Sequence, residues 1–108
     1  MRYSDDQRIM KILTTAKKLM AFISERHLTA EDIMKNEPLQ WAITTPLYNI
    51  GEQVYQLSDS YKAMRPDVPW LMIAGLRHRL VHDYDSTNWS LICEVIFQEI
   101  PGLIRKLS

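Results

Sequence analysis

Apolar residues recur at helical spacing over long stretches of this sequence, and this periodicity limits the possible folds more than any other feature. Glycine, which the many turns of a small β-protein require, occurs only three times, at Gly51, Gly75 and Gly102. We therefore predict an all-α fold, a compact helical bundle of four to five main helices. Gly51 and Gly75 fall inside predicted helices, where they would allow close helix packing. The length of 108 residues predicts a single domain spanning 1–108.

Capping residues predict where the first helices begin and end. Ser4 and Gln7 form a capping-box pattern at the start of the first helix, which the polar stretch 25–27 closes. Thr29 caps a short second helix that ends near Asn36. Asn36 in turn caps a long third helix.

Proline and polar segments predict the boundaries in the second half. The segment 66–69 contains two prolines and is the clearest break in the chain. A fourth main helix is expected from about Trp70 to His82, and Thr87 or Ser86 is expected to cap the last one. The Pro-Gly pair at 101–102 should kink or interrupt that last helix.

The charge balance excludes some classes of protein. The 13 Lys+Arg equal the 13 Asp+Glu, so the chain is not a broadly basic nucleic-acid coat protein. The single cysteine, Cys93, cannot form an internal disulfide and fits the cytoplasm, which is the expected location. The longest uncharged apolar run, near 70–76, spans about six residues, so no membrane association is expected.

The charges are nevertheless distributed unevenly along the chain. The segment 62–82 contains four basic residues and two histidines against one acid, whereas 83–99 contains four acids and no Lys or Arg. A dimer that brings two copies of the basic segment together would form a small phosphate site on a neutral protein.

One segment, 77–84, concentrates side chains that suit phosphodiester chemistry: two Arg, two His, an Asp and a Tyr. His82 can take the proton of a ribose 2′-hydroxyl, and Arg77 can neutralise the pentacoordinate phosphate. The two residues are separated by about 140° on an ideal helix. A cleft between two copies in a symmetric homodimer would bring both to one substrate.

Two other interpretations of this segment remain open. His78 and His82 are spaced i, i+4, as two ligands of a zinc ion on a helix would be, and Asp83 or Asp85 would supply the third ligand. The segment is equally typical of a solvated helix end, at which Arg and His side chains interact with the last carbonyls.

The same segment resembles a known family. Arg77-x4-His82-x-Tyr84 matches the Arg-x4-His-x-Tyr signature of the HepT-like HEPN toxins. The segments 50–52 and 65–70 resemble the family's third helix and its approach to the active helix. Helix order and length also agree, so the resemblance covers essentially the whole chain.

The resemblance implies a HEPN-like homodimer whose motif helices face each other, acting as a metal-independent endoribonuclease toxin on RNA such as tRNA, without a cofactor. It assigns Arg77 and His82 as the catalytic pair, with His78 and Asp83 in supporting roles. Tyr84 matches the tyrosine that a partner nucleotidyltransferase antitoxin modifies with AMP. The added bulk and negative charge beside the catalytic pair would repel RNA.

Two positions depart from the family pattern. His78 stands where the family often has Asn or Asp, and Thr45-Pro46 stand where it often has Arg-Asn. These departures leave room for an alternative, a catalytically inactive dimer that serves as the binding scaffold or substrate of a nucleotidyltransferase. A purely structural helical dimer is a third hypothesis.

Overall fold

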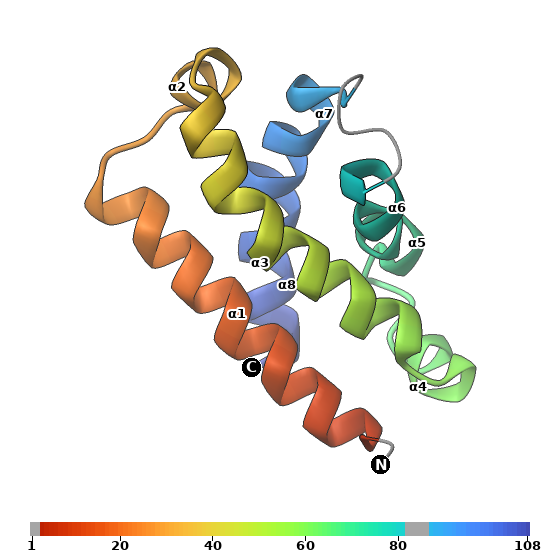
Figure 1. Cartoon of the computed structure of the whole chain (residues 1–108). Coiled ribbons are helices and arrows are strands. Elements are labelled where there is room, and N and C mark those ends of the chain that lie inside the picture. The colour runs from red at the N-terminus through yellow and green to blue at the C-terminus, as the bar shows by residue number, and fades with distance from the viewer. Residues whose placement is uncertain (1–2, 82–86) are drawn as a thin grey trace.

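The computed structural model describes residues 3–81 and 87–108, and every regular element within these ranges is a helix (Figure 1). The predicted all-α bundle is therefore confirmed. In chain order the elements are α1 (Asp5–Glu25), α2 (Ala30–Lys35), α3 (Glu37–Gln56), α4 (Asp59–Ala63), α5 (Trp70–Ala74), α6 (Leu76–Val81), α7 (Trp89–Glu94), the π-helical segment η2 (Val95–Glu99) and α8 (Ile100–Leu107).

The two longest helices, α1 and α3, lie side by side and run in opposite directions (Figure 1). α3 is central, because it also contacts α2, α5 and α6, while α8 packs against α1. The core is filled by side chains from all of these helices. Its most deeply buried members include Ile12, Ala16, Ile33, Ile43, Leu47, Ile50, Ile73, Leu76, Ile92, Ile96, Ile100 and Leu103.

The predicted starts of the first three helices are confirmed by their capping hydrogen bonds. The backbone N–H of Gln7 donates to Ser4 Oγ over 3.2 Å, and that of Ser4 donates to Gln7 Oε1 over 2.8 Å. Thr29 forms a second capping box with Asp32. Asn36 caps α3 by accepting a hydrogen bond from a backbone N–H of its first turn.

The helix predicted from Trp70 to His82 is divided at Gly75 into α5 and α6. The chain remains close to helical there, because the Gly75 N–H donates to Leu71 O over 3.0 Å and the Arg79 N–H donates to Gly75 O over 3.1 Å. Glycine is a poor helix former, which accounts for a break at this position. His82 lies outside the described residues.

The last helical region differs from the prediction at its start. Asn88, not Thr87, caps α7, since its side-chain oxygen accepts from the Leu91 N–H over 3.1 Å. The alternative cap Ser86 lies outside the described residues. Asparagine is as good a cap as serine or threonine, so the sequence offered several adjacent candidates.

The interruption expected at 101–102 occurs earlier, in η2, where the Ile100 N–H donates to Val95 O. Pro101 lies in the first turn of α8. Because proline lacks an N–H and its ring would meet the carbonyl of Phe97 four residues before it, the turn that precedes Pro101 widens. The predicted interruption is confirmed, but its position is shifted.

Within the described ranges, no helix combines the length and the apolar character needed to cross a lipid bilayer.

Candidate active site around Arg77

Helix α6 presents its polar residues on the side away from the core. Leu76 and Leu80 are buried, with exposed fractions of 1% and 2%, and anchor α6 in the bundle. Arg77 is half-buried on the flank that faces α3, while His78 and Arg79 are exposed. Burial of the two leucines therefore fixes the direction in which each charged side chain leaves the helix.

Gly51 allows α3 to approach α6 closely. A Cβ atom added at Gly51 would lie 2.9 Å from Arg77 N and 3.0 Å from Ile73 O, both of which are backbone atoms. The predicted role of Gly51 in close packing is confirmed. Gly75 differs, since the atoms nearest to its added Cβ belong to its own helical region, at Leu71, Met72 and Arg79.

The close approach places Arg77 beside two side chains of α3. Arg77 Nε donates to Glu52 Oε2 over 2.7 Å, and the two side chains are 36% and 30% exposed. The guanidinium carbon lies 4.2 Å from the ring centroid of Tyr55. Glu52 therefore engages Nε, so the remaining donors of the guanidinium are its Nη groups, the pair that forms bidentate hydrogen bonds with phosphate.

The same contacts keep Arg77 positively charged. The hydrogen bond to Glu52 is the main cause that raises the pKa of Arg77, and partial desolvation of the guanidinium opposes it. A fixed cation on a helix flank suits the neutralisation of a phosphate.

His78 and Arg79 face a different part of the molecule. They line a cavity of about 310 Å³ together with Thr87, Asn88 and Ile92, and Thr87 Oγ1 donates to Arg79 O over 3.3 Å. The structure therefore places His78 against the start of α7, whereas Arg77 faces α3.

The other predicted site residues, His82, Asp83 and Tyr84, lie outside the described residues. The zinc interpretation requires His82 and is therefore not tested by the structure. Within 3–81 and 87–108, the His, Cys, Asp and Glu side chains form no group of three or more that could hold a metal ion.

Sequence reasoning did not identify Glu52 and Tyr55 as partners of Arg77. The available signal was their spacing, since Tyr48, Glu52 and Tyr55 follow i, i+4, i+7 and share one face of α3. Thr45 and Pro46, which differ from the family pattern, lie on another face of α3. There they line a cavity of about 230 Å³ between α1 and α3.

The fold and the Arg77 site define an all-α bundle of the HEPN-like class, in which an arginine stands at the start of a short helix against the central helix. A sequence model of the family described as ribonuclease HepT-like matches residues 5–108, so the chain belongs to the HepT-like ribonuclease family.

Similar proteins carry ribonuclease names. A candidate RNase of Caldanaerobacter subterraneus subsp. tengcongensis is 36% identical over 89 residues, which are 81% of this chain and 80% of that protein. A candidate RNase of Methanocaldococcus jannaschii is 29% identical over 90% of this chain and 78% of its own length. The probable ribonuclease HepT of Thermococcus cleftensis is 27% identical over 77% of this chain and 76% of its own length. No solved structure shows significant similarity.

Proposed function

We propose that this protein is a metal-independent endoribonuclease toxin of a toxin–antitoxin pair that acts on cytoplasmic RNA such as tRNA. Membership of the HepT-like ribonuclease family and the ribonuclease names of the relatives support the reaction class. The observation that carries the proposal is the Arg77–Glu52 contact, which orients the arginine of the Arg77-x4-His82 signature.

The proposed reaction needs only the RNA and two side chains. His82 takes the proton of the ribose 2′-hydroxyl, and the 2′-oxygen attacks the adjacent phosphorus. The bond from phosphorus to the 5′-oxygen breaks, and the leaving oxygen takes a proton from solvent. Arg77 neutralises the charge of the pentacoordinate phosphate through its Nη groups while Glu52 holds its Nε.

The active unit in this proposal is a homodimer in which the helices that carry Arg77 face each other. Exposed apolar side chains lie near this helix: Leu71 on α5 is 91% exposed and Tyr55 on α3 is 54% exposed. Both residues line a hollow of about 680 Å³. Large exposed apolar residues that lie together are typical of a protein–protein contact.

Regulation in this proposal falls on Tyr84. A partner nucleotidyltransferase antitoxin transfers AMP from ATP: the phenol oxygen attacks the α-phosphate and pyrophosphate leaves. The attached phosphate would pair with Arg77 and exclude RNA. Incubation of the protein with ATP and the nucleotidyltransferase should increase its mass by one AMP, and Tyr84→Phe should abolish that increase.

The central test compares four purified proteins on tRNA and total RNA: wild type, Arg77→Ala, His82→Ala and the surface control Arg105→Ala. We expect cleavage by the wild type and the control, and loss of cleavage by at least a hundredfold in the other two. Circular dichroism should show the same helix content in all four. EDTA should leave the wild-type cleavage rate unchanged. Loss of wild-type cleavage in the presence of EDTA would favour the zinc interpretation instead.

The scaffold alternative predicts a different result. A wild-type protein that cleaves no RNA, yet still accepts AMP on Tyr84, would be a substrate of the nucleotidyltransferase and not an enzyme. Full cleavage by purified Arg77→Ala or His82→Ala would show that the catalytic pair is wrongly assigned.

A further inference from the structure

Helix α1 carries a segregated positive charge. Residues 7–24 contain four basic side chains, those of Arg8, Lys11, Lys17 and Lys18, and no acid. At about 100° per residue, Arg8, Lys11 and Lys18 share one side of the helix, and Lys17 lies on another. Three positive charges therefore follow one side of α1.

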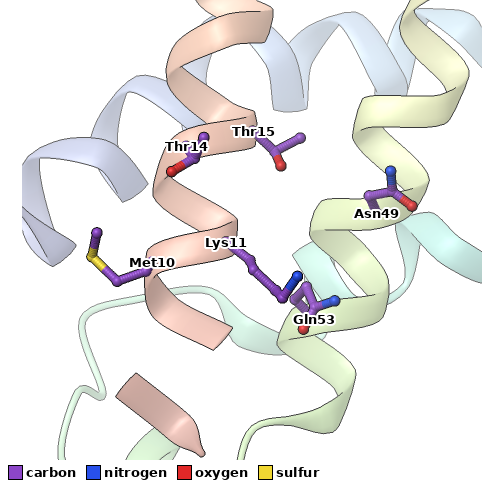
Figure 2. A pocket seen from close by; sticks show the side chains of 6 residues that line it. All are labelled: Met10, Lys11, Thr14, Thr15, Asn49 and Gln53. Atoms are coloured by element: carbon purple, nitrogen blue, oxygen red, sulfur yellow. The ribbon is translucent and has the colours of Figure 1, made fainter. Parts of the chain in front are cut away.

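This side of α1 faces a groove. A hollow of about 490 Å³ lies between α1 and α3, and Figure 2 shows Lys11 extending from α1 toward Gln53 of α3, with Thr15 and Asn49 farther along. Thr15 and Asn49 also line the neighbouring hollow of about 230 Å³, which Lys18 reaches. The two hollows share Thr15 and Asn49 in their linings, and together they are called here the α1–α3 groove.

The opposite wall of the α1–α3 groove leaves the positive charge uncompensated. The α3 residues that line it are uncharged, namely Ala42, Thr45, Pro46, Asn49 and Gln53. Within the described ranges, the ion pairs shorter than 4.0 Å join Lys35 to Glu31 and Arg77 to Glu52. No described carboxylate therefore neutralises Lys11 or Lys18.

Aromatic rings lie along the same path. Lys11 Nζ lies 4.5 Å from the ring centroid of Tyr3, whose side chain is 44% exposed. At the other end, the half-buried Phe22 lines the groove beside Lys18. A basic groove with side-chain amides, hydroxyls and neighbouring aromatic rings resembles the sites at which proteins hold single-stranded nucleic acid.

The groove lies one helix away from Arg77. Gln53 accepts a hydrogen bond from Arg8 Nη1 over 2.8 Å, and the preceding residue, Glu52, binds Arg77 on another face of α3. A helix with its side chains is about 10–12 Å wide. A strand that lies at Arg77 can therefore reach the groove by crossing α3 once.

We propose that the α1–α3 groove binds the sugar-phosphate backbone of single-stranded RNA that flanks the cleaved bond, with Lys11 and Lys18 contacting phosphates. This proposal rests on the proposed ribonuclease function and extends it to substrate binding. The groove's polar wall suits ribose hydroxyls and phosphates, which are the same at every position of an RNA strand.

The experiment measures binding of a single-stranded RNA to proteins that carry His82→Ala, which prevents cleavage. Lys11→Gln/Lys18→Gln is compared with the parent and with Lys17→Gln as the matched control. We expect the double variant to lose about tenfold in affinity at 0.1 M salt. The plot of the logarithm of the association constant against the logarithm of the salt concentration should become shallower by about 1.4. This corresponds to about 0.7 for each lost phosphate contact. Lys17→Gln should change neither quantity.

Three results would overturn this inference. One is a double variant with the affinity and salt slope of its parent, the second is an equal loss in Lys17→Gln, and the third is a parent that binds no RNA. RNA binding that depends on Lys11 and Lys18, together with a wild-type protein that cleaves no RNA, would support the groove proposal and contradict the proposed nuclease function. An acidic peptide that competes equally with RNA at the same residues would assign the groove to a protein partner.

Discussion

The environment of Arg77 shows how a surface arginine acquires a fixed orientation. Two α3 side chains hold it: Glu52 accepts the Nε proton and the Tyr55 ring lies against the guanidinium. Glu52 also places a negative charge near the proposed phosphate. Its two effects oppose each other, because it orients the arginine but weakens the attraction between the site and RNA.

This opposition leads to a kinetic prediction for Glu52→Gln. The amide oxygen can still accept from Arg77, but the weaker bond lets the guanidinium move, so kcat should fall about tenfold. The loss of a carboxylate near the phosphate should leave KM for RNA unchanged or lower. Steady-state cleavage of a short RNA checks both constants, and Glu94→Gln on α7 is the control.

Thermal stability distinguishes this positioning role from a merely structural one. The Arg77–Glu52 ion pair is partly exposed, so we expect Glu52→Gln to change the thermal midpoint very little. A Glu52→Gln protein with a strongly lowered midpoint and wild-type kcat would contradict the positioning role.

The two sides of this contact differed in how well the sequence predicted them. Local residues alone predict Arg77 as a catalytic residue, because it belongs to a short signature with His82 and Tyr84. Glu52 is separated from Arg77 by 25 positions, and only the packing at Gly51 joins them. Long-range partners depend on the packing of whole helices, which local patterns do not encode.

At the scale of helices, the predicted boundaries were accurate where the signal was local. Ser4, Thr29 and Asn36 cap their helices as expected, because a cap depends on residues within one turn. The break at Gly75 and the wide turn before Pro101 were predicted less well, since neighbouring hydrogen-bond patterns of similar energy compete there.

Gly51→Ala should test the contact between α3 and α6. Alanine is the better helix former by about 1 kcal/mol. Its Cβ would nevertheless lie 2.9 Å from a backbone nitrogen, which cannot move without shifting α6. We expect a net loss of about 1–3 kcal/mol in the free energy of unfolding, measured by urea denaturation, and a loss of cleavage through displacement of Arg77.

Gly102→Ala provides the matched control for that experiment. The nearest atom to a Cβ at Gly102 is Arg105 Nη2 at 3.6 Å, an ordinary contact with a flexible side chain. This variant should be as stable as the wild type or more stable by up to about 1 kcal/mol. Equal destabilisation by both variants would contradict the proposed packing role of Gly51.

The junction between α1 and α4 should make stability depend on pH. Asp5 accepts hydrogen bonds from Ser58 N over 3.0 Å and from Ser58 Oγ over 2.6 Å. The side-chain bond, followed by the backbone bond, lowers the pKa of Asp5. Because the folded-state pKa is depressed, this stabilisation is present above the unfolded value, near 4, and is lost as pH falls through the folded one.

Asp5→Asn should therefore lower the urea midpoint above about pH 5 and have progressively less effect toward about pH 2. Urea denaturation at several pH values measures the difference between wild type and variant. Asp6→Asn, in the same exposed first turn, is the control and should show a smaller dependence. A constant difference across the pH range would mean that the Asp5 carboxylate is not responsible.

For the whole molecule, the net charge of zero conceals an organised surface. Basic residues follow the groove side of α1, while the α3 wall opposite them is uncharged. Another face, around Leu71 and Tyr55, exposes large apolar side chains near Arg77, with Asp59 and Lys62 beside them. α3 separates these surfaces, so the proposed RNA groove along α1 and the proposed dimer contact beside α6 would not overlap.

Leu71→Glu should test the proposed dimer. A side chain that is 91% exposed contributes little to the stability of a single copy, so the variant should retain its helix content and thermal midpoint at low concentration. A charge buried in the contact between two copies is costly, so sedimentation equilibrium should show a monomer where the wild type is a dimer. Cleavage should decrease when the dimer is lost. Arg77 and His82 of one copy share a side of the helix only loosely, and the cleft between two copies completes the site. Met34 is an exposed apolar residue on α2, so the control variant Met34→Glu should remain dimeric and active. A monomeric wild type that cleaves RNA at the full rate would show that one copy suffices.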